Sequence, residues 1–318
     1  MDWLAEFFSG VQQALFESAV VPVLFAVGLG NFLEDGYEAT AWFLVGLIQI
    51  IVLLAVIGPL QRWRPVEAIT DRATIRTDVL YTLIHRLGVF RLALFFTLEP
   101  LFDEGFGALR AAGVGTWHLD QLWPGVTDHA VISFLLYLVV FDFVAYWTHR
   151  GQHQFEWWWR LHSLHHAQRQ MTMWSDNRNH LLDDIVVDAI MVVVAQLIGV
   201  PPAQFVAIVA FTQLSESFQH ANVRIWFGQI GERLWVSPRF HRLHHAVGIG
   251  HESDGPKTLG GHNFGVLLPW WDMLFGTANF QLRYDATGVR DQIEQQRDYG
   301  RGFWSQQWMG LKRLAGKA

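Results

Sequence analysis

The sequence predicts an all-α integral membrane protein with about four transmembrane helices, a membrane-dipping helical hairpin and a cytoplasmic, histidine-rich cap. Three observations lead to this class. Of the 318 residues, 51% are hydrophobic and only 16% are charged, which is too apolar for an ordinary soluble domain. Several segments approach the ~20 apolar residues that a spanning helix needs. Eight of the 15 histidines fall into three short sets that come after these segments.

Four apolar segments are predicted to span the membrane. They are Val11–Leu29, Ala39–Leu60, Leu80–Phe102 and Ala130–Trp147. His85, Arg86 and Arg91 interrupt the third segment, which leaves a partly interfacial position open for it. After the fourth segment, Trp157–Trp159 beside Arg160 predicts an anchor at the level of the lipid headgroups.

A hairpin is predicted next. The apolar stretches Ile185–Val200 and Ala203–Phe218 flank Pro201 and Pro202. Because proline interrupts a helix but is tolerated in its first turn, we expect two helices joined by a tight turn that dips into the bilayer. No repeat and no linker divides the chain, so residues 1–318 are predicted to form one membrane-embedded domain, with the catalytic region at about 130–280.

The charge of the loops predicts the orientation. The loop Asn31–Glu38 contains acidic residues and no Lys or Arg, whereas Gln61–Asp78 contains four arginines. Loops rich in Lys and Arg stay in the cytoplasm. The second loop, and with it the histidine sets that follow the fourth segment, is therefore predicted to be cytoplasmic.

Composition also excludes several functions. The chain has no cysteine, which excludes a haem-thiolate oxygenase, an all-cysteine iron–sulfur cluster and a thiol nucleophile. The formal net charge of −6 and the lack of a basic tail argue against a nucleic acid partner. Any redox chemistry must therefore use other ligands.

The three histidine sets have the spacing of metal ligands on helices. They are His149 and His153; His162, His165 and His166; and His241, His244 and His245. Residues three and four apart share a helix face, so each set is expected to aim its imidazoles in one direction. Neutral imidazole binds iron, zinc or copper, and three converging sets can surround two ions. Without metal, so many buried imidazoles would leave donors and acceptors competing, at ~1–3 kcal/mol for each unsatisfied group.

Two more histidines and one carboxylate are candidates. His220 lies where the hairpin returns to the same side and is predicted as a ninth ligand. His180, at the hairpin's entry, is a possible tenth ligand, with a surface or interfacial role as the alternative. Asp142 shares a helix face with His149, and an ionisable residue inside an apolar run is usually functional. It is therefore a candidate acceptor that orients a ligand imidazole; a hydrogen bond between helices is the alternative.

These residues lie in motifs that resemble the fatty acid hydroxylase/sterol desaturase superfamily. The matching text is DFVAYWTHRGQH at Asp142–His153, HSLHH at His162–His166, HAN at His220–Asn222, PRFHRLHH at Pro238–His245, NFG at Asn263–Gly265 and WDMLFGT at Trp271–Thr277. The match extends over roughly half the chain in the order of the family, and three histidine boxes with a closing WD-x-LFGT make it specific.

The resemblance implies four spanning helices under a cytoplasmic cap, in a bacterial inner membrane or the endoplasmic reticulum. It implies two iron ions that activate O2, and the hydroxylation, desaturation or ether cleavage of a lipid that enters from the bilayer. It adds Asn222 and Asp272 to Asp142 as catalytic residues. Because no dinucleotide-binding fingerprint and no fused haem domain is visible, electrons are expected from a separate donor: a reductase, a ferredoxin or a cytochrome b5-like protein.

One segment departs from the family pattern. Many members have an Asp two residues before the Asn of an Asn-Tyr-Gly motif, where this chain has Gly261 before Asn263. His262 is a candidate local substitute for the missing carboxylate, and a surface position is the alternative. The preceding loop Val247–Gly261 is rich in glycine, and its lone His251 is expected to be a surface residue.

Two other functions fit the pattern less well. A metal transport or storage protein would need histidines spread through the depth of the bilayer, but these gather on one side. A zinc hydrolase with a metal-bound water needs three protein ligands, and eight or nine histidines exceed that number. An oxygenase therefore accounts best for the pattern.

Overall fold

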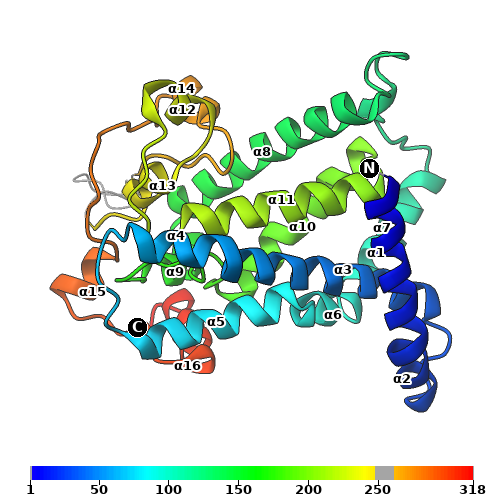
Figure 1. The fold of residues 1–318 in the computed structure, drawn as a ribbon, viewed down its shortest axis with the longest axis horizontal. Coiled ribbons are helices and arrows are strands. Elements are labelled where there is room, and N and C mark those ends of the chain that lie inside the picture. Colours follow the sequence, from blue (N-terminus) through cyan, green and yellow to red (C-terminus); the bar gives the residue numbers. More distant parts are fainter. Residues whose placement is uncertain (1, 248–260, 318) are drawn as a thin grey trace. The chain divides into compact units, whose positions relative to one another are not determined.

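The computed structural model describes residues 2–247 and 261–317, which form helices and connecting segments without a β-strand (Figure 1). The first helices are α1 (Asp2–Leu15), η1 (Phe16–Val20), α2 (Val21–Ala26), α3 (Leu33–Val52), η2 (Leu53–Ile57), α4 (Gly58–Trp63), α5 (Arg72–Arg86), α6 (Val89–Phe95), α7 (Glu99–Ala111) and η3 (Leu119–Gln121). They are followed by α8 (Ala130–Gln154), α9 (Glu156–His166), α10 (Leu181–Ile198), α11 (Pro202–Gln219), α12 (Gly228–Leu234), α13 (Pro238–His244), α14 (Trp270–Leu274), α15 (Arg290–Glu294) and α16 (Phe303–Leu314). His251 and most of its glycine-rich loop lie outside the described residues.

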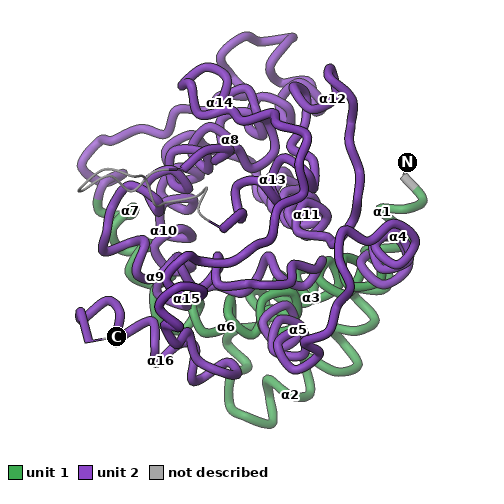
Figure 2. Tube along the Cα trace, turned by 90° about the vertical axis from the view of Figure 1, so that its left-hand side faces the viewer, with its two compact units in different colours: residues 1–52, 83–108 green, residues 53–82, 109–318 purple. Residues whose placement is uncertain are grey.

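The chain forms two compact units, coloured separately in Figure 2. Residues 1–52 and 83–108 form the first unit, and residues 53–82 and 109–318 form the second. Every predicted metal ligand and catalytic residue belongs to the second unit. The expectation of one membrane domain stays a prediction.

Three helical stretches among the described residues are long and apolar enough to cross a membrane. They are Trp3–Ala26, Leu33–Trp63 and Ala130–Gln154. These overlap the first, second and fourth predicted spans, which are therefore confirmed as helices of membrane-spanning length and composition. The cytoplasmic orientation stays a prediction.

The third predicted span, Leu80–Phe102, is wrong as a single helix. In the structure this stretch is divided among α5, α6 and α7. Gly88 ends α5 with a φ of 79°, a left-handed conformation that glycine adopts without the steric cost other residues meet. The apolar count of the segment could not reveal this break, because one glycine hardly changes hydropathy.

The predicted hairpin is confirmed as two helices, α10 and α11. α10 ends at Gly199, which has a φ of 64°, and Pro202 occupies the first turn of α11, where its missing N–H costs nothing. The Tyr137 hydroxyl of α8 lies 3.2 Å from the carbonyl of Ile198 and 3.1 Å from that of Gly199. The turn is thereby fixed to α8, while its depth in a bilayer stays a prediction.

A hydrophobic core joins α8, α10 and α11. Its buried residues include Tyr137, Leu138 and Phe141 of α8, with Ile198 and Ile208 from the hairpin. Burying such a side chain stabilises a fold by ~1.5–3 kcal/mol. This packing sets the position of α8, the helix that carries the first histidine set.

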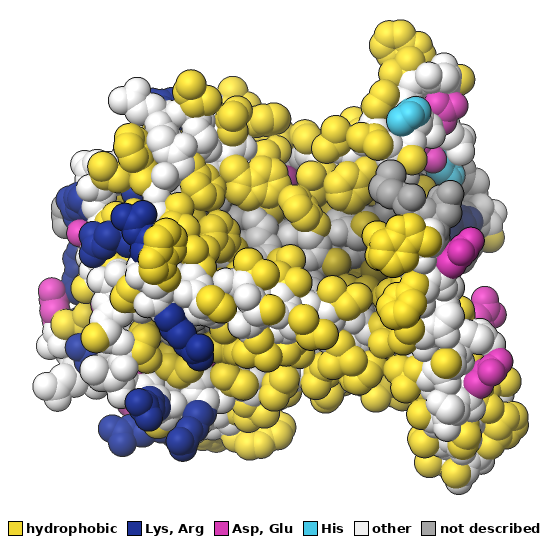
Figure 3. Space-filling model, viewed as in Figure 1, with side chains coloured by type: hydrophobic (Ala, Val, Ile, Leu, Met, Phe, Trp, Pro, Cys, Tyr) yellow, Lys and Arg dark blue, Asp and Glu magenta, His cyan; other side chains and the backbone are white. Residues whose placement is uncertain are grey.

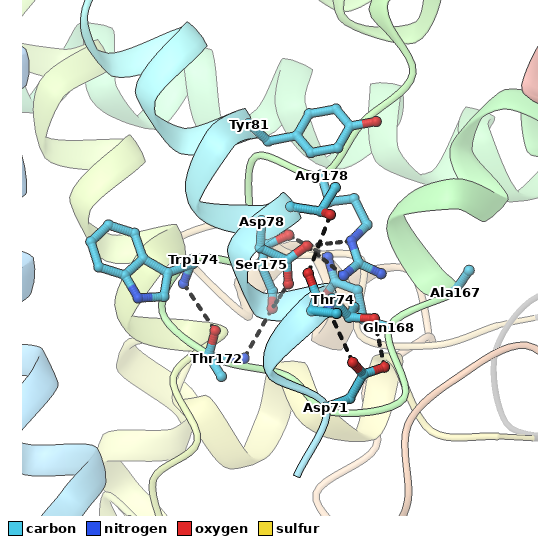
Figure 4. A network of polar contacts seen from close by, with 12 residues as sticks. Asp71, Thr74, Asp78, Tyr81, Ala167, Gln168, Thr172, Trp174, Ser175 and Arg178 are labelled. Carbon is cyan, nitrogen blue, oxygen red and sulfur yellow. Dashed lines mark hydrogen bonds and ion pairs between the residues drawn. The ribbon is translucent and has the colours of Figure 1, made fainter. Parts of the chain in front are cut away.

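A polar network fixes the segment between α9 and α10 (Figure 4). Arg178 and Asp78 form an ion pair with both side chains at most 2% exposed, although burial raises the pKa of Asp78 to about 6. The Ser175 hydroxyl accepts a hydrogen bond from the Thr172 N–H at 2.9 Å, and Gln168 donates to the Ser175 carbonyl. The network tethers the chain directly after the histidines of α9.

The tryptophan anchor is only partly as predicted. Trp157 is 48% exposed, whereas Trp158 and Trp159 are 6% and 8% exposed. In Figure 3, hydrophobic side chains cover much of the helical surface, and Lys and Arg gather at the left-hand end of the view, where Figure 1 labels α5, α9 and α16.

Candidate metal centre

α8 presents its polar residues on one buried face. Asp142, Tyr146, His149 and His153 are each at most 8% exposed, at the 4-3-4 spacing read from the sequence. Four or three residues bring a side chain back to the same side of a helix. The shared face is confirmed, and it is turned into the protein.

Each box of three histidines divides between two places. On α9, His162 and His166 join one cluster of ring nitrogens and His165 joins another. Neighbouring positions on a helix point ~100° apart, so adjacent histidines reach different places. The set on α13 divides the other way: His241 and His245 join the cluster of His165, and His244 joins the cluster of His162. The expectation that each set aims in one direction therefore holds for His149 and His153 and is wrong for the two sets of three histidines.

Two groups of buried histidines result. The five-histidine group contains His149, His153, His162, His166 and His244, and the four-histidine group contains His165, His220, His241 and His245. Within each group the candidate ligand nitrogens lie within 4.8 Å of one another. The groups are adjacent, since the rings of His166 and His245 stack with centroids 4.2 Å apart.

In the five-histidine group, Nδ1 atoms are held by oxygen acceptors. The Nδ1 distances are 2.9 Å from His149 to the Phe264 carbonyl, 3.0 Å from His162 to the Asp183 carboxylate and 2.8 Å from His244 to the His262 carbonyl. An oxygen acceptor requires the proton on Nδ1, which leaves the Nε2 lone pair available as a metal ligand. Ring orientation and tautomer are thus set together.

In the four-histidine group, Nε2 atoms face one another. The Nε2 of His220 lies 3.1 Å from those of His165 and His241, and the Nε2 of His241 lies 3.1 Å from that of His245. The Nδ1 of His220 donates to the Glu216 carbonyl at 2.8 Å, so its Nε2 carries a lone pair. Two nitrogens bound at ~2.1 Å to one ion in a right-angle arrangement are ~3.0 Å apart, which matches this spacing.

Burial and donor chemistry fit metal ions in both groups. Among the described residues, the Nε2 atoms of His162, His166 and His244 are buried without a hydrogen-bond partner, an arrangement that is costly unless a metal accepts the lone pairs. Burial, and then neighbouring histidines, hold the pKa values of His165 and His245 well below the ordinary value. Neutral imidazole is the form that binds metal.

His180 is not part of either group. It caps α10, with its Nδ1 accepting the Leu182 N–H at 3.1 Å and its Nε2 lying 2.9 Å from the Gln307 carbonyl. Both ring nitrogens are therefore occupied by the backbone. Its prediction as a tenth ligand is corrected to a structural role at the start of α10.

Asp142 contacts no ligand imidazole. Its carboxylate accepts the N–H groups of Leu267 at 2.7 Å and Leu268 at 3.1 Å, and the indole N–H of Trp271 at 2.9 Å. Instead of the predicted contact with a ligand imidazole, the Asp142 carboxylate fixes the backbone segment after Phe264. The prediction that Asp142 shares a helix face with His149 is confirmed, whereas the predicted hydrogen bond to a ligand imidazole is wrong.

Asp272 and Asn222 also hold backbone segments. Asp272 accepts the N–H groups of Phe264 at 2.8 Å and Gly265 at 2.7 Å, and so positions the carbonyl that receives His149. The Asn222 side chain accepts the N–H groups of Val66 and Glu67, each at 3.1 Å. Both act on the backbone around the centre, and their predicted catalytic role stays a prediction without a contact to support it.

Asp183 is the residue that sequence reasoning missed. It is 1% exposed and accepts hydrogen bonds from Gln152 at 2.8 Å, from the Trp158 indole at 2.7 Å and from His162 at 3.0 Å. The sequence feature that could have identified Asp183 is an ionisable residue at the start of an apolar helix, three positions after His180. His262, considered as a substitute carboxylate, contributes its backbone carbonyl to His244.

The fold and the site define a membrane protein with a buried, polyhistidine metal centre. Residues 134–277, which include all nine grouped histidines, match the model of the fatty acid hydroxylase family. This part of the chain is a domain of the fatty acid hydroxylase and sterol desaturase superfamily. It is thus an enzyme of a class of iron-dependent, oxygen-dependent lipid oxidoreductases.

Three curated relatives illustrate the range. The chain is 27% identical to ornithine lipid hydroxylase OlsE of Rhizobium tropici, over 78% of this chain and 70% of that protein. It is 23% identical to an alkylglycerol monooxygenase of Caenorhabditis elegans, over 76% of this chain and 41% of that protein. It is 29% identical to a putative Delta(7)-sterol-C5(6)-desaturase 2 of Arabidopsis thaliana, over 45% of this chain and 46% of that protein. No solved structure matches the chain.

Proposed function

We propose that the protein is a membrane-bound di-iron oxygenase that hydroxylates a lipid. The observation that carries this proposal is the pair of adjacent imidazole groups, in which five and four buried histidines converge. Two irons bound there would supply the activation of O2 toward an unactivated C–H bond. In the net reaction one oxygen atom converts C–H to C–OH and the other leaves as water, with two electrons and two protons consumed.

The chain's own residues hold and shield this centre. The nine histidines provide nitrogen ligands, and Asp183 and the Phe264 carbonyl keep two of the rings in place. Asp142 and Asp272 fix the segment that carries Phe264. Every ligand is buried, so bulk water is kept from the reacting atoms.

The substrate class follows from the membrane helices and the relatives. A lipid that enters from the bilayer can place a carbon at the centre while its head remains at the interface. The names of OlsE and of the alkylglycerol monooxygenase support hydroxylation of a membrane lipid, and the sterol desaturase supports desaturation as the second candidate. We place the centre on the cytoplasmic side, with electrons from a reductase, a ferredoxin or a cytochrome b5-like donor.

A metal transport function is less well supported. Transport requires ligands at successive depths along a path, whereas the nine histidines converge in two touching groups. Their buried, fixed rings suit a resident cofactor better than a moving ion.

The experiment that tests the proposal combines metal analysis with isotopic oxygen. Protein purified without O2 is analysed for iron, then supplied with a chemical reductant, 18O2 and either ornithine lipid or an alkylglycerol. We expect iron in both groups and a product that carries one 18O atom. A product that has lost two hydrogens without gaining 18O would replace hydroxylation by desaturation. An iron-loaded protein that consumes no O2 with lipid present would contradict an oxygenase. His241→Ala is the inactive control.

A further inference from the structure

α16 has two faces of opposite character. Its inner face is buried and consists of Phe303, Gln306, Gln307, Gly310 and Arg313. On its outer face, Trp304 is 78% exposed, Trp308 59% and Leu311 38%. Residues four and seven apart share a helix side, so these three side chains form one apolar stripe.

The inner face is fixed, so the outer face cannot turn inward. The Gln307 side chain accepts the Leu181 N–H at 2.9 Å and donates to the Tyr81 hydroxyl at 2.9 Å. Arg313 donates to the carbonyl of Arg160 on α9 at 3.2 Å. At Gly310, an added Cβ would lie 2.2 Å from the His180 ring, which shows how closely the helix is seated.

The sequence of α16 and its flanks carries only positive charges, of which Arg313 lies on the buried inner face. Residues 301–317 include Arg301, Lys312, Arg313 and Lys317 and no Asp or Glu. Lys312 lies with its ammonium 6.0 Å from the centre of the Trp308 ring. Exposed tryptophan next to Lys and Arg on an amphipathic helix is the composition of a helix that lies in a membrane interface.

α16 is connected through α9 to the end of a spanning helix. α8 is apolar enough to cross a membrane and ends at Gln154, and α9 begins at Glu156. At this junction Phe155 is 54% exposed and Trp157 48%. α16 packs against α9, as Figure 1 shows, so the stripe is carried by a helix that is joined, through α9, to the end of a spanning helix.

We propose that the outer face of α16 docks on the headgroup layer of the membrane that α8 crosses. Trp304 and Trp308 reach the boundary between headgroups and acyl chains, and Lys312 faces anionic lipid headgroups. This surface is separate from the metal centre and does not depend on the reaction that the centre catalyses.

Fluorescence from a dye at a single position tests the docking in the whole chain. A single introduced cysteine can carry the dye, because the chain has no cysteine of its own. Trp304→Cys and Trp308→Cys, each labelled with an environment-sensitive dye, are placed in nanodiscs of phosphatidylcholine with nitroxide-labelled lipid. Glu294→Cys, at an exposed position before α16, is the matched aqueous control. We expect severalfold stronger quenching at positions 304 and 308 than at 294. Equal, weak quenching at all three positions would overturn the proposal.

Lipid charge and copy number separate the membrane from other occupants. Adding phosphatidylglycerol should strengthen quenching at position 308, and Lys312→Gln should remove that increase. A blue-shifted emission at 304 and 308 that appears only in discs with two protein copies, without nitroxide quenching, would assign the stripe to a second copy of the chain and overturn the membrane proposal.

Discussion

The five-histidine and four-histidine groups are adjacent, yet the protein holds their rings differently. In the first group, a carboxylate and two backbone carbonyls fix three Nδ1 atoms, and the carboxylate is that of Asp183. In the second group, the Glu216 carbonyl accepts a hydrogen bond from the Nδ1 of His220. A carboxylate raises the basicity of the ring it holds. The two candidate metal positions are therefore inequivalent, and we expect the five-histidine group to hold an ion more tightly.

The largest effect should come from removing a ligand of the smaller group. His245→Ala leaves three histidines in its group, whereas His166→Ala leaves four in the other. We expect His245→Ala to weaken one Co2+ site by more than ~100-fold, beyond the loss typical of a supporting residue, and His166→Ala to cost less. The check is Co2+ titration followed by visible absorption. Equal losses would contradict the comparison, and His180→Ala, outside both groups, should retain both ions.

The Asp183 carboxylate should affect one group alone. Asp183→Asn keeps the shape but weakens the acceptor, so Co2+ affinity of the five-histidine group should fall by ~10–100-fold with the other group unchanged. Trp158→Phe is the matched control, because it removes a hydrogen bond to Asp183 and leaves the contact with His162. Both Co2+ sites weakening together would show that the carboxylate acts on the fold and not on one ring.

Asp142 should behave as a structural residue by the same measurement. Asp142→Asn places an amide N–H toward the N–H donors of Leu267, Leu268 and Trp271, so the folded state should lose ~1–3 kcal/mol. Unfolding by denaturant gives this value, and Co2+ titration gives the affinity at both groups. We expect affinity within about twofold of the parent. A drop of tenfold or more at the five-histidine group would restore the ligand-orienting role predicted for Asp142.

Lowering the pH should destabilise the metal-free forms of the two groups to a similar extent. Of all the predictions, this one expects the smallest difference between them. Burial lowers the pKa values of His166 and His244 in one group, and of His165, His241 and His245 in the other. Below about pH 6.5 the unfolded chain then binds more protons than the folded chain, so the metal-free protein should lose stability as the pH falls.

Thermal unfolding of metal-free protein between about pH 7 and about pH 5 measures this loss. The metal-loaded protein should resist acid better, because a metal that binds only the folded state stabilises it. Metal-free protein that is as stable at about pH 5 as at about pH 7 would contradict the lowered histidine pKa values.

The local patterns were readable from the sequence because they depend on neighbouring residues. Apolar runs identified three helices long enough to span a membrane, and spacings of three and four identified eight of the nine grouped histidines; the ninth, His220, was found from its place at the end of the hairpin. Pro201 and Pro202 located the hairpin turn. Each of these features follows from helix periodicity or from the backbone chemistry of one residue type.

Pairings across the chain were decided by the tertiary structure. The sequence paired Asp142 with a ligand because both lie on α8, yet the carboxylate that meets His162 is Asp183, on α10. The carbonyl groups of Phe264 and His262 left no signal at all, since every residue has a carbonyl and only folding brings one to a ring nitrogen. The division of the α9 and α13 histidine boxes between two groups likewise depends on how α8, α9 and α13 pack. Spacing along the chain determines which residues share a helix face, and packing determines what that face meets.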